Sequence, residues 1–147
     1  MKTQAEKRVL GIDFGSVKIG VAVSDPLRII AQGLVTLPND RNIVEKIGSL
    51  VVEHEVGLIV VGMPFTLKGE KGVKAKEVDA FVERLKGALD VHVVTLDERF
   101  TSRIAEQTLR SMGTTRKQRA NKARIDTMAS ALILQSFLDR TKHSVGC

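Results

Sequence analysis

The apolar run Gly57–Gly62, with the sequence GLIVVG, constrains the fold more than any other segment of the chain. A run without polar side chains is typical of a strand buried on both faces, whereas a half-solvated strand alternates apolar and polar residues. Such a strand needs other elements on both sides of its sheet. The chain has 147 residues, the usual size of one domain and enough to bury about 70% of the unfolded surface. We therefore expect one domain, spanning residues 1–147, with a sheet covered on both faces.

Three strand-like segments precede this run. They are Val9–Phe14, Lys18–Ser24 and Ile29–Leu37, and only a few residues separate each from the next. Short connections join antiparallel neighbours, because a parallel pair requires a crossover of a dozen or more residues. The first part of the chain is therefore predicted to be an antiparallel meander.

Helical spacing of apolar residues dominates the rest of the chain. Asn39 or Asp40 can cap a first helix, and a strand at Val91–Leu96 follows a second. Two more helices are expected at about Thr101–Ser111 and Asn121–Arg140. The apolar faces of the first two helices are Ile43, Val44, Ile47, Leu50 and Val51, and Val78, Phe81, Val82, Leu85 and Leu89. The order β-β-β-α-β-α-β-α-α predicts an α/β fold with a five-stranded mixed sheet flanked by helices.

The net charge of the chain points to polyanionic partners. The formal net charge is +6 and the sequence pI is about 9.7. The chain has no Trp or Tyr and only five Phe, which argues against a single-strand binding surface on which bases stack. A bound nucleic acid is therefore expected to be held through its backbone phosphates.

Cysteine usage and the N-terminal sequence indicate the compartment. The only cysteine is Cys147, which leaves no partner for an internal disulfide and is typical of a reducing environment. The N-terminal segment MKTQAEKRVL lacks the apolar region of a signal peptide. We expect a cytoplasmic protein.

Acidic residues follow two of the predicted strands. Asp13 lies at the end of the first strand, two residues before Gly15, whose lack of a side chain lets a phosphate or metal approach the backbone. Asp97 and Glu98 follow the fifth strand. The carboxyl ends of parallel strands share one edge of a sheet, which is where ligand sites usually form. The alternatives are a turn-forming Asp13 and an acid that pairs with Arg99.

Alternation along the fifth strand separates its two acids. Asp97 and Glu98 point to opposite sides of the sheet, so only one of them readily joins Asp13. We prefer Glu98, because its longer side chain reaches further.

Asp126 is the third acid, near the start of the last helix. At 100° per residue it lies between Ile133 and Phe137, inside the apolar arc. An acid near a helix start is also favoured by the helix dipole. A carboxylate that faces the core needs a partner, however, and a metal ion is one. Together, Asp13, Glu98 and Asp126 would form an oxygen-lined site suited to Mg²⁺ or Mn²⁺ and to in-line attack at phosphorus.

Four segments of this chain resemble the YqgF/RuvX family. They are VLGIDFGSVKIGVAVSD, VVGMPFTLKGEKG, TLDERFTS and KARIDTMASALILQSFL, in that order between about Val9 and Leu138. The resemblance implies a ribonuclease H-like fold, a cytoplasmic setting, and a nuclease that matures the 5′ end of pre-16S rRNA. It also implies that Asp13, Glu98 and Asp126 are the catalytic and metal-binding residues. In the related resolvases the glutamate follows the fourth strand, where this chain has Gly62-Met63-Pro64 and no acid before Glu70.

Basic residues near these acids are expected to contact nucleic acid. Lys68 and Lys71 lie in a glycine-rich segment whose backbone N–H groups would contact phosphate. A basic segment precedes Asp126 and leads into its helix. The full set of expected contacts is Lys18, Lys68, Lys71, Arg99, Arg116, Lys117, Arg119, Lys122 and Arg124. The alternative is that both segments are solvated surface connections.

The sequence leaves rival functions open. A Holliday junction resolvase would use the same carboxylates on branched DNA, and a non-catalytic RNA-binding protein would keep the fold without the chemistry. The segment DFGSVKIG also resembles the phosphate motif of sugar-kinase and chaperone-type ATPases, but those proteins close two such domains on ATP. Metal-dependent cleavage that is lost when one acid is changed favours the nuclease.

Overall fold

The computed structural model describes residues 7–63, 72–97 and 122–145, with side chains of the last helix described for 127–141. The elements in chain order are β1 (Arg8–Phe14), β2 (Lys18–Ser24), β3 (Ala31–Pro38), α1 (Ile43–Glu53), β4 (Val56–Met63), α2 (Val73–Ala88), β5 (His92–Asp97) and α5 (Lys122–Val145).

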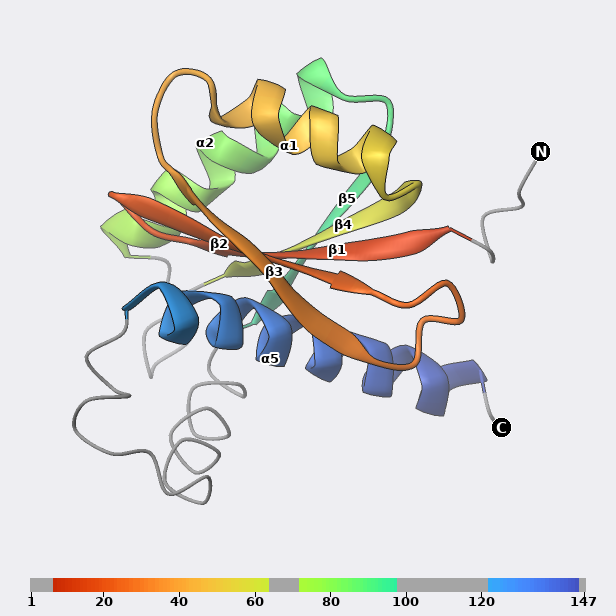
Figure 1. Ribbon diagram of the computed structural model, residues 1–147. Coiled ribbons are helices and arrows are strands. Elements are labelled where there is room, and N and C mark those ends of the chain that lie inside the picture. Colours follow the sequence, from red (N-terminus) through yellow and green to blue (C-terminus); the bar gives the residue numbers. More distant parts are fainter. Residues whose placement is uncertain (1–6, 64–71, 98–121, 146–147) are drawn as a thin grey trace.

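The strands form one five-stranded mixed sheet in the order β3-β2-β1-β4-β5 (Figure 1). The β1–β2 and β2–β3 pairs are antiparallel, and β4 is parallel to both β1 and β5. The predicted meander and mixed sheet are therefore confirmed. Strand β1 lies in the middle of the sheet, where its carboxyl end is flanked by β2 and β4.

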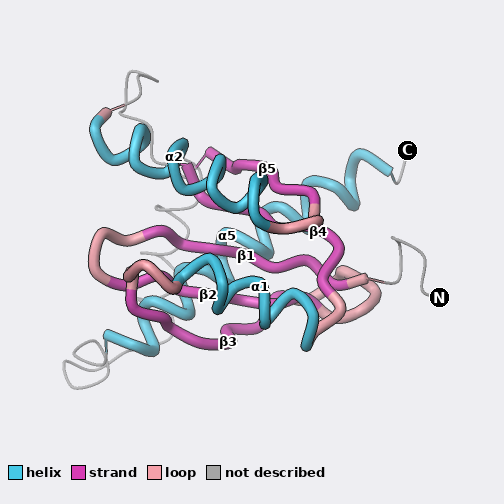
Figure 2. Tube along the Cα trace, turned by 90° about the horizontal axis from the view of Figure 1, so that it is seen from above, coloured by secondary structure: helices cyan, strands magenta, loops and turns pink. Residues whose placement is uncertain are grey.

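Helices cover both faces of this sheet. Figure 1 shows α1 and α2 on one side and α5 on the other. Seen from above in Figure 2, α1 and α2 lie over the sheet and α5 passes behind it. This three-layer arrangement explains the run GLIVVG, because β4 must bury side chains on both faces.

The core is divided by the sheet into two layers. Ile59 and Val61 of β4 pack into the layer under α1 and α2. Val60 packs into the layer under α5, together with Val9 of β1. Among the described residues, no helix is long and apolar enough to cross a membrane.

The third strand begins at Ala31, two residues later than its apolar sequence predicts. Backbone N–H groups of Ile29 and Ile30 donate to Asp25 Oδ1 (2.7 and 2.9 Å), which holds both residues in the β2–β3 turn. Desolvation raises the pKa of the Asp25 carboxyl, but the backbone donors, led by Ile30 and Ile29, outweigh it and hold the pKa below its ordinary value. A short-range polar contact thus overrides β propensity at Ile29.

The predicted cap of the first helix is wrong. Helix α1 begins at Ile43 after Asn42, and no side-chain hydrogen bond caps it. The Asp40 carboxylate instead accepts a hydrogen bond from the Asn42 N–H (2.9 Å) and lies 3.5 Å from Lys46 Nζ. Helix α5 extends past the predicted Arg140 to Val145. The helix expected at Thr101–Ser111 lies outside the described residues.

Candidate active site

Asp13 is half-buried at the carboxyl end of the central strand β1, on the face covered by α5. Its face follows from the alternation of β1. Leu10 and Ile12 pack into the layer under α1 and α2, whereas Val9 packs into the layer under α5. Pairing with β2 runs without a shift from Leu10 to Phe14, so Asp13 shares the face of Val9 and Gly11.

Gly11 lets α5 approach this face closely. A Cβ atom at Gly11 would lie 2.6 Å from Leu134 Cβ and 3.2 Å from the Ser130 carbonyl oxygen. Ser130 is fully buried, and its hydroxyl donates to the Thr127 carbonyl oxygen (2.8 Å). The contact fixes how α5 lies against β1, two residues before Asp13.

The direction of α5 brings its first turns toward the carboxyl end of β1. Thr127 packs against Gly33 of β3, and the Gln135 side chain accepts a hydrogen bond from the Ala31 N–H (2.9 Å). Because β3 runs parallel to β1, α5 runs antiparallel to both strands. Position 126 precedes Ser130 by about one helical turn on the same helix face. The backbone at position 126 therefore lies beyond the Gly11 contact, in the direction of Asp13.

Asp97 lies on the opposite face of the sheet. Leu96 packs into the layer under α5, whereas Val93 packs into the layer under α1 and α2. Alternation along β5 places Asp97 on the face of Val93, away from Asp13. The sequence prediction that Asp97 does not join Asp13 is consistent with this placement.

The turn after Asp13 is tightly built. Asn39, directly after β3, donates from Nδ2 to the Gly15 carbonyl oxygen (2.8 Å) and from its backbone N–H to the Val17 carbonyl oxygen (2.9 Å). A Cβ atom at Gly15 would collide with the Lys18 carbonyl oxygen. The turn between β1 and β2 therefore requires glycine at position 15. This requirement is separate from the predicted approach of a ligand to the Gly15 backbone. The sequence predicts Asn39 only as a possible helix cap and does not indicate its hydrogen bond to this turn.

Only part of the predicted metal site falls within the described side chains. Glu98 and the Asp126 side chain lie outside them. Among the side chains that are described, no three His, Cys, Asp or Glu gather closely enough to hold a metal ion. The donor that is described, the Asp13 carboxylate, is a hard oxygen ligand and matches the chemistry that Mg²⁺ and Mn²⁺ prefer.

One predicted phosphate contact is described in full. Lys18 is exposed at the start of β2, where it pairs with Pro38 across the sheet, at the same end of the molecule as Asp13. Helix α5 begins with Lys122, and Arg124 follows in its first turn, but their side chains are not described. The remaining predicted contacts, Lys68, Lys71, Arg99, Arg116, Lys117 and Arg119, lie outside the described residues.

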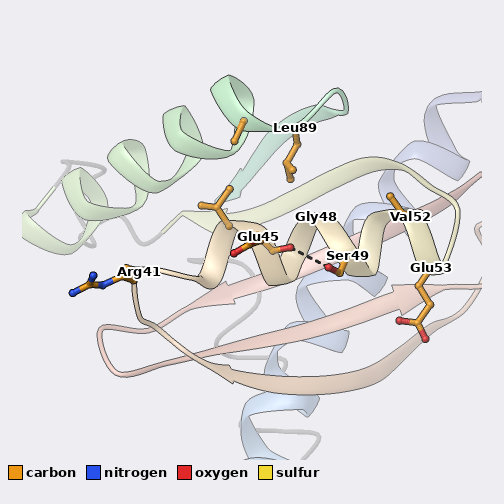
Figure 3. Close-up of a pocket in the computed structure, with 9 residues that line it drawn as sticks. Arg41, Glu45, Gly48, Ser49, Val52, Glu53 and Leu89 are labelled. Carbon is orange, nitrogen blue, oxygen red and sulfur yellow. Dashed lines mark hydrogen bonds between the residues drawn. The ribbon is translucent and has the colours of Figure 1, made fainter.

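Two hollows lie on the α1 and α2 side of the sheet. An open groove of about 800 Å³ separates α1 from the end of α2, and Figure 3 shows Leu89 directed into it. Its two carboxylates are Glu45 and Glu53 of α1, on the side of the sheet opposite Asp13. A smaller hollow of about 290 Å³ lies beside Phe14, at the carboxyl end of β1.

Solved structures of low sequence identity show the fold class of this chain. A chain titled "T. thermophilus RuvC in complex with Holliday junction substrate" aligns with a TM-score of 0.56 and 16% identity, covering 92% of this chain and 96% of that chain. The fowlpox virus resolvase in complex with Holliday junction DNA aligns with a TM-score of 0.54 and 10% identity, covering 91% and 98%. The expected ribonuclease H-like fold, of the type found in RuvC, is confirmed.

Within that class the chain belongs to the RuvX family. The family model, described as "RuvX: Holliday junction resolvase", matches residues 7–140. Relatives named "Putative pre-16S rRNA nuclease" include one from Sulfurihydrogenibium sp., 42% identical over 93% of this chain and 93% of its own length. Another, from Salinibacter ruber, is 43% identical over 93% and 96%. The family assignment made from the four sequence segments is confirmed.

Proposed function

We propose that this protein is a metal-dependent endonuclease that cleaves nucleic-acid phosphodiesters during 5′-end maturation of pre-16S rRNA. The observation that carries the proposal is the position of Asp13, half-buried at the carboxyl end of the central strand and facing α5, in a RuvX-family chain. The names of the relatives refer to pre-16S rRNA, and they support pre-16S rRNA as the substrate.

Glu98 and Asp126 are the proposed partners of Asp13. Leu96 faces α5 and Asp97 faces away, so one further residue of alternation would return position 98 to the face of Asp13. The antiparallel course of α5 supports Asp126 in the same way, since its backbone position precedes Ser130 by one turn. Three acids would then meet from a central strand, a neighbouring strand end and a helix.

These acids would hold Mg²⁺ or Mn²⁺. When bound, such ions neutralise charge that develops at phosphorus and polarise the attacking water. Asp13 contributes a hard oxygen donor held by a strand, which is a more rigid support than a loop. Without a cation, the three carboxylates would repel one another and raise one another's pKa.

Basic residues position the substrate in this proposal. Lys18 is exposed at the end of the molecule that carries Asp13, where its ammonium group can meet a backbone phosphate. Arg99, Lys122, Arg124 and the segments around Lys68 and Arg116 would extend this contact. Phosphate contacts supply affinity without reading sequence, in keeping with a chain of net charge +6.

A second candidate substrate is a four-way DNA junction. The family description and the titles of the two resolvase structures support it, because both refer to Holliday junctions. The same carboxylate chemistry cuts RNA and DNA. The two substrates are therefore separated by binding and cleavage preference.

The experiment compares both substrates with one preparation of protein. A precursor fragment spanning the 5′ end of 16S rRNA and a four-way DNA junction are incubated with Mg²⁺ or Mn²⁺, and with Asp13→Asn protein as control. We expect metal-dependent cleavage of the RNA at a defined site by wild type alone. Preferred cleavage of the junction would favour the resolvase, and binding without cleavage of either substrate would favour a non-catalytic RNA-binding protein.

A further inference from the structure

The small hollow beside Phe14 lies at the edge of the sheet that carries the proposed active site. Its volume is about 290 Å³, and it lies on the α2 side of β1. Asp13 and Phe14 are consecutive residues of β1 and point to opposite faces. A nucleic-acid strand that crosses the carboxyl edge of the sheet from the Asp13 side would therefore pass this hollow. The residues that define it are Phe14, Ser16, Asn39, Glu77, Phe81 and Arg84.

The rim of the hollow carries unused hydrogen-bonding groups. Ser16, Glu77 and Arg84 are exposed, and none of their side chains makes a hydrogen bond or ion pair to another described residue. Arg84 supplies donors only, Glu77 supplies acceptors only, and the Ser16 hydroxyl supplies both. The rim can therefore satisfy a ligand whose edge carries donors and acceptors side by side.

The floor of the hollow is apolar. The rings of Phe14 and Phe81 lie with their centroids 5.0 Å apart, and both are buried. The Asn39 side chain ties the neighbouring turn to the end of β3 through the Gly15 carbonyl oxygen. A flat group placed in this hollow would lie over the small exposed part of these rings while its own edge faces the polar rim.

We propose that this hollow binds an unpaired nucleobase of the nucleic acid that is cleaved at Asp13, from a nucleotide next to the cleavage site. This inference rests on the proposed function, because the nucleobase belongs to the nucleic-acid strand that Asp13 would help to cleave. A nucleobase presents a flat apolar face together with donors and acceptors on its edge, which matches the floor and the rim. A phosphate fits less well, because the Glu77 carboxylate would repel it.

The test measures binding in the absence of divalent metal, so that cleavage is not needed. Single-stranded oligonucleotides spanning the cleavage site, in RNA and DNA versions, carry one abasic nucleotide at each position in turn. Wild type is compared with Glu77→Gln and Arg84→Ala. Glu83→Gln and Lys86→Ala are matched controls, since Glu83 and Lys86 are exposed charges of α2 that do not line the hollow. Thermal unfolding verifies that each variant is folded.

We expect one abasic position next to the cleavage site to weaken wild-type binding by about fivefold or more. Arg84→Ala and Glu77→Gln should weaken binding of the intact oligonucleotide but leave binding of that abasic oligonucleotide unchanged. The control variants should keep the full abasic effect. An RNA-only effect would assign the hollow to RNA bases, and an equal effect in both versions would assign it to unpaired bases of either polymer.

Two results would overturn the proposal. One is a wild-type protein without any abasic-sensitive position. The other is an Arg84→Ala loss that is equal on intact and abasic oligonucleotides, because Arg84 would then contact only the backbone. Cleavage is scored separately after metal is added. A protein that cleaves without an abasic-sensitive position disproves the hollow alone, and one with that position but without cleavage disproves the nuclease alone.

Discussion

Asp13 is the residue on which the proposed chemistry depends most. It is the penultimate residue of β1, between the buried Ile12 and Phe14, and it lies on the α5 face of the sheet. Asp13→Asn preserves shape but removes a charged ligand, and charge stabilisation by metal is worth several kcal/mol. We expect metal-dependent cleavage to fall by about a thousandfold or more, measured in single-turnover assays, with the far-UV circular dichroism unchanged. An Asp13→Asn protein with wild-type activity would remove Asp13 from the active site.

Asp97 and Glu98 are adjacent residues with different predicted roles. Asp97 lies on the face of β5 opposite to Asp13, so Asp97→Asn should alter stability or local order while cleavage continues. Glu98→Gln should abolish cleavage, because it removes a proposed metal ligand. Both variants are assayed side by side at several Mn²⁺ concentrations. The reverse ranking would assign the ligand role to Asp97 and leave the nuclease proposal intact.

At the scale of elements, the contact between β1 and α5 holds the two sides of the proposed site together. Gly11→Ala would place a methyl group 2.6 Å from Leu134 Cβ, so the helix must shift or the core must strain. Overpacking of this kind costs about 1–3 kcal/mol of unfolding free energy. We expect urea denaturation to show that loss, with a parallel loss of activity because α5 carries Asp126.

Gly87→Ala is the matched control for this substitution. Gly87 lies in α2, and a Cβ atom there would meet nothing within 4 Å. Replacing a helical glycine by alanine should raise the unfolding free energy by about 0.5–1 kcal/mol. If Gly11→Ala and Gly87→Ala had the same effect, close packing at Gly11 would not explain the sequence.

The basic segment before α5 is the second element with a testable role. If Arg116, Lys117 and Arg119 each neutralise a backbone phosphate, changing all three to Ala should weaken binding to any single-stranded RNA about equally. The slope of log affinity against log salt should fall by roughly 2, from about 0.7 per lost contact. Titrations of both proteins at several salt concentrations measure this slope. An unchanged slope would show that the segment does not contact the RNA backbone.

At the scale of the whole molecule, metal binding should couple to folding. If Asp13, Glu98 and Asp126 meet in the folded chain as proposed, they repel one another without a cation, so Mg²⁺ or Mn²⁺ should stabilise the native state. At a metal concentration of 100 times Kd the gain is about 2.7 kcal/mol. We expect added metal to raise the Tm of wild type, and to raise that of Asp13→Asn much less. A Tm that is independent of metal in wild type would contradict the proposed site.

The sequence by itself determined the order of the described elements, the covering of both faces of the sheet and the candidate acids. The reason is that burial patterns are local: GLIVVG requires two covered faces, and alternation along β5 places Leu96 and Asp97 on opposite faces. The strand bounds Lys18–Ser24 were predicted without error. Local patterns failed where a side chain hydrogen-bonds to nearby backbone N–H groups, as Asp25 does in delaying β3 to Ala31.

Only the tertiary structure decided which residues share the carboxyl edge of β1. The close contact of Gly11 with Leu134 joins residues more than a hundred positions apart, and no pattern in the sequence encodes that pairing. From the sequence alone, Arg84 and Glu77 are predicted to lie on a solvated helix face. In the folded chain, the end of β1, the β1–β2 turn and Asn39 form a hollow beside them. Periodicity specifies the face that a residue occupies within its element. The neighbours across elements follow from strand order, helix direction and close packing, which depend on the whole chain at once.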